Sequence, residues 1–458
     1  MWDFSLNNFD SVWAIVVQFL LLLGFLVLGN MLRRSIPFLR KSFIPSALIG
    51  GVLLALVGLL VKLISPDFYP HFIDKQIMKV ITYHCLAIGF IATTLKVANK
   101  DKQKGLGILS IQNGLLTGAT YMLQAVFGLI TVLVFWWIGA KVFHASGIIL
   151  PLAFGQGPGN AMTWDINFGI ANGSFGLALA SIGFIVASVV GVVYLNIYRR
   201  KGEIIRGDGI AERRVEEFVE DHEIEDSDSI DKMSVQVGIV ALCYAAAFGI
   251  MCALHATGVK MVRDIAWGFN FIFGVITATL AKAILVFLRK KKVIKHKYIN
   301  NYQMDRISGL AFDLMIIAGV AAIEINEIKN YIWILIALTV VGTIVTIIFV
   351  RFITKRCFSG LHHHMFLVNF GTLTGTASNG MILLREVDST FETQASNIFI
   401  VSQFPAMVAV APLLLLTSFA GKSPINTYIA LGIFLALAAI YTTVIFILQK
   451  KVVEKQFK

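Results

Sequence analysis

Repeated runs of about twenty apolar residues constrain this chain more than any other feature of its sequence. A helix needs roughly 20 such residues to cross the hydrocarbon core of a bilayer. Charge clusters separate eleven runs, and the expected spans are 11–31, 44–64, 78–95, 108–138, 174–197, 234–254, 265–288, 307–324, 332–350, 396–418 and 425–448. The sequence therefore predicts an all-α polytopic membrane protein whose surroundings are a lipid bilayer.

Composition agrees with this class. Of the 458 residues, 57% are apolar and only 14% are charged, and the mean hydropathy is +0.78. These values exclude a soluble enzyme, a secreted disulfide scaffold and a nucleic-acid-binding domain, so we expect no nucleic-acid partner. The four cysteines lie in or beside apolar segments without metal-ligand spacing, which is typical of small core residues.

Positive charge is distributed unevenly between the two sides of the predicted membrane domain. If successive spans cross the membrane in opposite directions, 30 of the 39 Lys and Arg residues lie on one side of the membrane. The positive-inside rule then predicts an outer N-terminus and an inner C-terminus. Acidic Asp3 and Asp10 precede the first run and Arg33 and Arg34 follow it. We expect this first segment to be a retained helix and not a signal peptide.

One polar segment divides the chain into halves of similar length. Residues 199–233 contain 7 basic and 12 acidic residues, and we interpret them as a cytoplasmic linker. The expected organisation is a first membrane repeat at 1–198, this linker, a second membrane repeat at 234–420, and an extra C-terminal helix with a basic tail at 421–458.

Two apolar stretches, 145–173 and 362–388, are too rich in glycine and polar residues to be ordinary spans. FGQGPGNA (154–161) aligns with FGTLTGTA (370–377), with Phe, Gly, Gly and Ala at the same spacing. Each stretch follows the fourth helix of its half. Because five spans precede the linker, the second half enters the membrane in the opposite sense. The pattern predicts two inverted-topology five-helix repeats, each with a re-entrant hairpin.

Irregular backbone at membrane depth is tolerated where it lines a polar cavity or is buried in protein. We expect the tips of the two hairpins to meet near the midplane, with Asn160 and Ser378 as N-caps of the second limbs. Two helix N-termini facing each other would suit a small carboxylate. Unwound carbonyls, hydroxyls and amides at the tips would supply oxygen ligands for sodium. The alternative is that the glycines serve only close helix packing.

Other polar residues allow several interpretations. Asp313 is the only carboxylate well inside an expected span, and it either couples an ion or contacts substrate, or makes a packing hydrogen bond. Gln112 and Asn113 either face the first hairpin or have a purely structural role, and the same alternatives hold for Asp165, which either acts in ion entry at the outer face or is structural. The triplet His362–His364 suggests a metal, but consecutive histidines on a helix cannot all converge on one ion, so we expect an interfacial cluster. No catalytic set is present, and we expect no enzyme.

The motifs FGQGPGNAMTW (154–164) and FGTLTGTASNGMILLREVD (370–388), and less specifically FIPSALIGG (43–51), resemble the glutamate:sodium symporter family. The resemblance implies a homodimer in the bacterial plasma membrane that couples import of glutamate, a small anionic substrate, to sodium by moving a core domain in elevator fashion. It places the substrate contacts at Gly155, Gln156, Gly157, Pro158, Gly159, Asn160, Thr374, Gly375, Thr376, Ser378 and Asn379. The sodium contacts would be at Asp313, Thr372, Thr376 and Ser378.

Three features depart from the family pattern: the acidic linker, the extra last helix and the hairpin-tip sequences. The related 2-hydroxycarboxylate symporters, which carry citrate or malate, are therefore the nearest alternative. An ion channel is an alternative of another class, because paired re-entrant loops also build selectivity filters. An integral membrane enzyme would require convergent catalytic groups that the predicted membrane interior does not offer.

Overall fold

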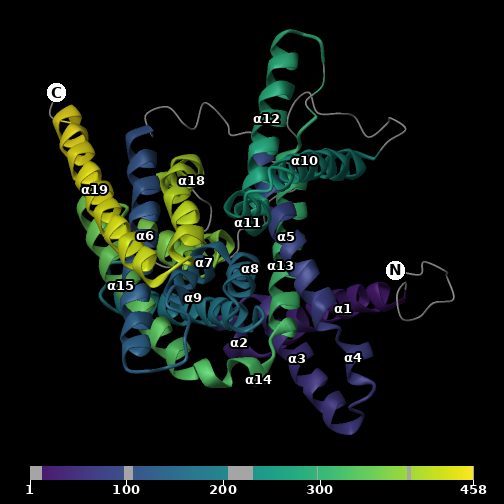
Figure 1. Ribbon diagram of the computed structural model, residues 1–458. Helices are drawn as coiled ribbons and strands as arrows, with labels where there is room; N and C mark the ends of the chain where they lie inside the picture. The colour runs from purple at the N-terminus through teal and green to yellow at the C-terminus, as the bar shows by residue number, and fades with distance from the viewer. Residues whose placement is uncertain are drawn as a thin grey trace.

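The computed structural model describes residues 13–96, 107–204, 231–294, 296, 298–388 and 393–456 (Figure 1). The side chains of residues 261, 378 and 451–456 also lie outside this description. Within the described residues all regular secondary structure is helical. Most of the linker expected at 199–233 lies outside the described residues.

The long helices follow the expected apolar runs. In the first half they are α1 (Ala14–Ser35), α3 (Ser46–Ile64), α5 (Lys75–Leu95), α6 (Gly107–Trp137) and α9 (Ser174–Arg200). In the second half they are α10 (Lys232–His255), α12 (Asn270–Lys290), α13 (Asn301–Ala322), α15 (Ile332–Cys357), α18 (Gln394–Ala420) and α19 (Pro424–Gln456). Short helices connect them: α2 (Pro37–Lys41), α4 (Tyr69–Phe72), η3 (Ser146–Ile148), α11 (Lys260–Gly268), α14 (Ile325–Ile328) and η5 (Lys329–Tyr331).

Ten helical segments in the described part of the chain are long and apolar enough to cross a membrane. Two of them include preceding short helices: α4 belongs to the segment from Tyr69 to Leu95, and α14 and η5 belong to the segment from Ile325 to Cys357. The eleventh expected span, 307–324, is the 22-residue helix α13. This helix is more polar than the ten because it carries Asp305, Arg306 and Asp313. The protein is thus an all-α, multi-pass membrane protein.

Each glycine-rich stretch forms a pair of short helices that pack against each other. The first hairpin consists of α7 (Ile149–Gln156) and α8 (Pro158–Phe168). The second hairpin consists of α16 (His362–Thr374) and α17 (Ala377–Arg385). The chain is therefore interrupted within both stretches, at the places where the sequence pattern predicts a tight turn.

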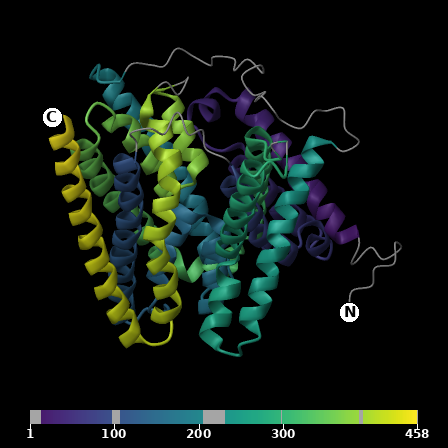
Figure 2. The same cartoon turned by 90° about the horizontal axis from the view of Figure 1, so that it is seen from above.

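The helices form two groups that each draw on both halves of the chain (Figures 1 and 2). The support group contains α1, α3, α5, α10, α12 and α13. The hairpin group contains α6, α9, α15 and α18 together with both hairpins, and α19 packs on α6 and α18 at its outer side. The two groups meet where α5 and α13 pack against α8, and where α13 also packs against α9.

Helix pairings in one half correspond to pairings in the other. The contact of α1 with α3 corresponds to that of α10 with α12, and the contact of α3 with α13 corresponds to that of α12 with α5. The third long helices of the two halves, α5 and α13, cross each other directly, where the Phe312 ring lies against Gly89. The two halves therefore pair their helices in the same order, and the inverted topology of the repeats stays a prediction.

Lysine side chains satisfy carbonyl groups at the ends of this central pair. Lys75 donates through Nζ to the carbonyl oxygens of Ala321 and Ile323 at the end of α13. Lys282 donates through Nζ to the carbonyl oxygens of Thr94, at 2.5 Å, and Lys96, at 3.3 Å, at the end of α5. The last carbonyls of a helix have no intrahelical partner, so these cations stabilise both helix ends.

Candidate functional site

The tip of the first hairpin is a one-residue joint at Gly157. Its φ of 90° lies in the left-handed region, which glycine adopts without steric cost. Pro158 follows at the first position of α8, where its missing N–H removes no helical hydrogen bond. The prediction that Asn160 caps this helix is wrong, because the N-cap is Gly157. Asn160 instead lies inside the first turn and donates through Nδ2 to Gln156 Oε1.

The tip of the second hairpin is formed by Gly375 and Thr376. Thr376, not Ser378, is the N-cap residue of α17, so the second N-cap prediction is also wrong. The Ser378 side chain lies outside the described part of the structure. Thr376 Oγ1 donates to Asn379 Oδ1 at 3.2 Å. The two limbs touch at Gly371 and Gly380, where a Cβ added to Gly371 would lie 2.8 Å from Gly380 Cα.

Helices α6 and α9 bring the two hairpins together. On α6, the Tyr121 ring lies against Gly155 of the first hairpin, and Gln124 Nε2 donates to the Leu373 carbonyl of the second hairpin at 2.9 Å. On α9, a Cβ added to Gly183 would lie 2.6 Å from the Thr374 carbonyl oxygen and 3.1 Å from the Phe154 ring. The ends of both first limbs therefore share the same neighbours.

The buried polar atoms of the hairpins and α6 that have no hydrogen-bond partner among the described residues include four side-chain amide atoms. They are the side-chain oxygens of Gln124, Asn160 and Asn369 and the amide nitrogen of Asn379. Gln124 and Asn160 are fully buried, and Asn369 and Asn379 are nearly so. Leaving a buried polar group unpaired costs about 1–3 kcal/mol. These four groups on the hairpins and on α6 are therefore candidates for contact with a polar or charged ligand.

Gln124 and Asn369 are absent from the residues predicted from sequence. Gln124 lies in the middle of an apolar helix, and Asn369 directly precedes the aligned FG pair of the second hairpin. A polar side chain at membrane depth is itself a signal for a functional position. The position of Gln124 within an apolar run could therefore have identified it from the sequence. Its contact with the second hairpin is visible only in the tertiary structure.

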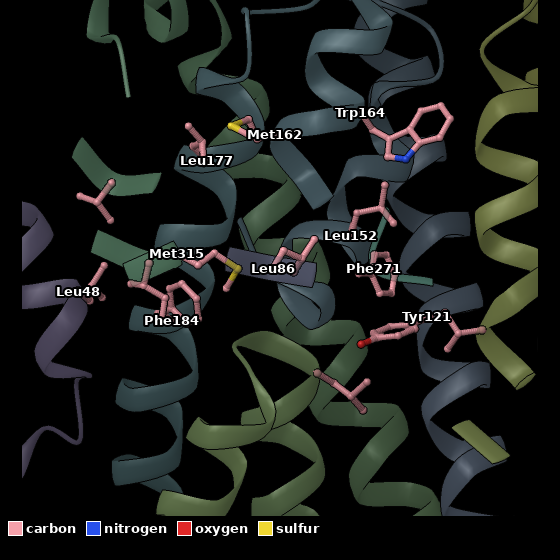
Figure 3. Packing of buried hydrophobic residues seen from close by; sticks show 14 of the residues in the cluster. Leu48, Leu86, Tyr121, Leu152, Met162, Trp164, Leu177, Phe184, Phe271 and Met315 are labelled. Carbon is pink, nitrogen blue, oxygen red and sulfur yellow. The ribbon is translucent and has the colours of Figure 1, made fainter. Parts of the chain in front are cut away.

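The tip of the first hairpin packs against the support group. Met315 Cε on α13 lies 3.2 Å from the position of an added Cβ on Gly157, and an added Cβ on Gly319 would lie 3.2 Å from Pro158 Cβ. On α5, an added Cβ on Gly159 would lie 3.0 Å from Leu86 Cβ. Figure 3 shows this layer, in which Leu86 and Met315 belong to the same cluster of buried apolar side chains. The candidate site thus borders the contact between the two groups.

Asp313 is half-buried on α13, and among the described residues no hydrogen bond or ion pair involves its carboxylate. The hydroxyls of Thr372 and Thr374 donate to carbonyls of their own helix, to Val368 and Phe370 respectively, each at 2.7 Å. Asp313 is therefore not joined to the threonines of the second hairpin. The shared sodium set of Asp313, Thr372, Thr376 and Ser378 stays a prediction.

The interpretation that Gln112 and Asn113 face the first hairpin is wrong. Gln112 Nε2 donates to Gln449 Oε1 of α19 at 3.0 Å and to the Ile445 carbonyl at 3.2 Å. Asn113 Nδ2 donates to Ser402 Oγ of α18 at 2.7 Å. Asn113 Oδ1 accepts from Asn369 Nδ2, also at 2.7 Å. These side chains therefore contact α18, α19 and the second hairpin, and not the first.

The carboxylate of Asp165 is held by backbone N–H groups. Its side chain is fully buried, and its carboxylate accepts hydrogen bonds from the backbone N–H groups of Ala171, at 2.8 Å, and Gly176, at 3.0 Å. These bonds tie the end of α8 to the start of α9. A buried carboxylate held by backbone donors is satisfied in place, so the structure favours this anchoring role over the expected role in ion access.

Comparison with models of known protein families finds no match, and comparison with curated proteins finds none either. The function is therefore argued from the geometry of the two hairpins.

Proposed function

We propose that the protein is a sodium-coupled secondary active symporter that imports glutamate or a similar small acidic amino acid. The observation that carries this proposal is the convergence of the two hairpin tips on α6 and α9, with unpaired polar atoms buried around them. The proposed setting is the bacterial plasma membrane, with the chain as a homodimer. No step of this activity requires an enzyme reaction.

The acidic substrate is favoured by the two helices that begin at the tips. The first turn of a helix presents N–H groups and a partial positive charge, which attract a carboxylate. Helices α8 and α17 start at Pro158 and Ala377 and provide two such ends. The unpaired Nδ2 of Asn379, on the first turn of α17, is a further donor for an anion. A small molecule with two carboxylates could use both ends.

Sodium as the co-transported substrate is favoured by the unpaired oxygens. Gln124 Oε1, Asn160 Oδ1 and Asn369 Oδ1 are neutral amide oxygens in a buried setting. Oxygen ligands of this kind suit hard alkali and alkaline-earth cations. Neutral ligands also leave the charge of sodium available to offset the charge of the substrate, which supports transport of both together.

Alternating access is favoured by the division into two helix groups. The hairpin group contains the proposed site, and its contact with the support group passes along α5 and α13. We propose that the hairpin group moves relative to the support group, carrying the site from one membrane face to the other. The reciprocal pairing of helices supports this, because inverted repeats allow two equivalent arrangements of one chain.

The experiment is uptake of radiolabelled L-glutamate into proteoliposomes that contain the purified protein. An inward sodium gradient should drive accumulation that collapses when potassium replaces sodium. Unlabelled aspartate, malate and citrate are added as competitors, because the 2-hydroxycarboxylates also carry the carboxylates that the site would bind. The uptake measurement is repeated with radiolabelled malate and citrate. Sodium-driven accumulation of malate or citrate without accumulation of glutamate would contradict the amino-acid substrate, and large single-channel currents would contradict a transporter.

A further inference from the structure

A cluster of two histidines and a glutamate lies apart from the hairpin tips. His362 and His363 begin α16, and Glu203 follows the end of α9. One potential ligand atom from each residue lies within 4.8 Å of the others. The three side chains line a small cavity of about 40 Å³, which is large enough for an ion and a bound water.

The geometry points to a binding site for a transition-metal ion of the Zn²⁺ type at Glu203, His362 and His363. Two imidazoles and a carboxylate are a ligand set that proteins use for Zn²⁺, with an open position for water. Ligand atoms lie about 2.0–2.2 Å from such an ion, so binding requires the three side chains to close in on it from the separations of up to 4.8 Å that they have in the free protein.

The local structure explains why two of the three consecutive histidines converge. His362 and His363 lie at the first turn of α16, with ring centroids 4.0 Å apart and an interplanar angle of 40°. Their rings therefore face a common space. His364 is not part of this cluster. The sequence argument that three consecutive histidines cannot all converge on one ion holds, because only two of them belong to this cluster.

The Tyr194 hydroxyl orients the His363 ring through the nitrogen that would not bind the ion. His363 Nδ1 lies 2.9 Å from the Tyr194 hydroxyl, and its Nε2 lies 3.2 Å from Glu203 Oε2. A ligating histidine usually hydrogen-bonds through its other ring nitrogen, which sets the tautomer and the ring orientation. Binding of the ion at Nε2 would replace the contact with Glu203 by a shared ion and would leave Nδ1–H to donate to Tyr194.

Two basic residues on the cavity wall limit the affinity. Arg351 and Lys355 line the same cavity, and the Arg351 guanidinium lies 5.1 Å from the centroid of the Tyr198 ring. Their charges oppose a second cation, so we expect weaker binding than at a structural zinc site with four protein ligands. The two imidazoles favour Zn²⁺ over Ca²⁺, which takes oxygen ligands.

A bound ion would connect two parts of the chain that are far apart in sequence. Glu203 belongs to the segment that leaves α9, and the histidines open the first limb of the second hairpin. The ion would therefore tie this segment to α16. The site and its test do not depend on the transport proposal, because metal binding is measured without substrate.

The test is binding of Zn²⁺ to the purified, chelator-treated full-length protein in detergent, with Ca²⁺ as the comparison ion. Equilibrium dialysis with metal analysis gives affinity and stoichiometry, and Co²⁺ in place of Zn²⁺ reports tetrahedral ligation by its visible absorption. Glu203→Gln and His362→Ala should each weaken Zn²⁺ binding at least tenfold, and Tyr194→Phe by about tenfold. Zn²⁺ should also raise the Tm of the wild-type protein, and Glu203→Gln should remove this shift.

His364→Ala is the matched control, since it removes a neighbouring histidine that is outside the cluster. It should bind Zn²⁺ as the wild-type protein does. Wild-type affinity in both Glu203→Gln and His362→Ala would overturn the proposal, as would equal binding of Ca²⁺. Glu203 is exposed and His362 only half-buried, so both variants should fold even if a change at buried His363 does not.

Discussion

Asn160 shows how one side chain can serve both local structure and a site. Its Nδ2 donates a hydrogen bond to Gln156 Oε1 within the first hairpin. Its Oδ1 is fully buried and has no hydrogen-bond partner among the described residues. A packing residue would have both atoms satisfied, because an unpaired buried oxygen destabilises the fold. The unpaired oxygen therefore makes Asn160 a candidate ligand contact whose role a substitution can test.

Asn160→Ala should reduce sodium-driven uptake at least tenfold, because it removes the unpaired oxygen, and it should leave the protein folded, because the only hydrogen bond lost is the one to Gln156 Oε1, which costs about 1–3 kcal/mol. The measurement is initial uptake in proteoliposomes with matched protein content, together with Tm in detergent. Asn196→Ala is the control, since Asn196 is exposed on α9 and makes no hydrogen bond that would be lost. Equal uptake by both variants would remove Asn160 from the site.

At the scale of elements, the second hairpin depends on the absence of side chains between its limbs. Gly371 and Gly380 face each other, and an added Cβ on Gly380 would meet the Val368 carbonyl oxygen and Thr372 Oγ1. Backbones can approach this closely only where both residues are small. The glycines thus serve close packing, as the alternative interpretation of the sequence proposed, and at the same time position the tip.

Gly380→Ala should lower the free energy of unfolding by about 1–3 kcal/mol, because the limbs must separate to admit the methyl group. Thermal unfolding in detergent, followed by circular dichroism, should show a lower Tm. Gly432→Ala on α19 is the control, because an added Cβ there meets nothing within 4 Å. It should be neutral or stabilising by up to about 1 kcal/mol. A Tm for Gly380→Ala equal to that of the control would contradict the close packing of the limbs.

At the scale of the whole molecule, the question is whether the two helix groups move relative to each other. Leu177 on α9 belongs to the hairpin group and Gly319 on α13 to the support group. An added Cβ on Gly319 would lie 3.1 Å from Leu177 Cδ2. These two positions therefore face each other across the contact between the groups.

The double variant Leu177→Cys and Gly319→Cys, in a background without the four native cysteines, should form a disulfide under oxidation. Oxidation should lower the rate of uptake at least tenfold, because the disulfide holds α9 against α13. Reduction of the disulfide should restore the rate. Each single variant treated with the same oxidant is the control. Full uptake by the cross-linked protein would contradict relative movement of the groups.

The sequence by itself determined the class of the protein and the location of the interrupted segments. Apolar runs and their charged boundaries are local patterns, because each helix satisfies its own backbone hydrogen bonds in a membrane. The break at Gly157 follows from local glycine chemistry in the same way, because its φ of 90° lies in the left-handed region. Even so, the N-cap residues were misassigned, since the exact first residue of a helix depends on its neighbours.

Only the tertiary structure decided which side chains share a site. Gln124 and Leu373 are 249 residues apart, and Glu203 and His363 are 160 apart, yet each pair is in direct contact. No local pattern encodes such contacts, because they arise from the packing of helices from both halves of the chain. That packing buries Gln124 against the hairpin tips and brings His363 to Glu203.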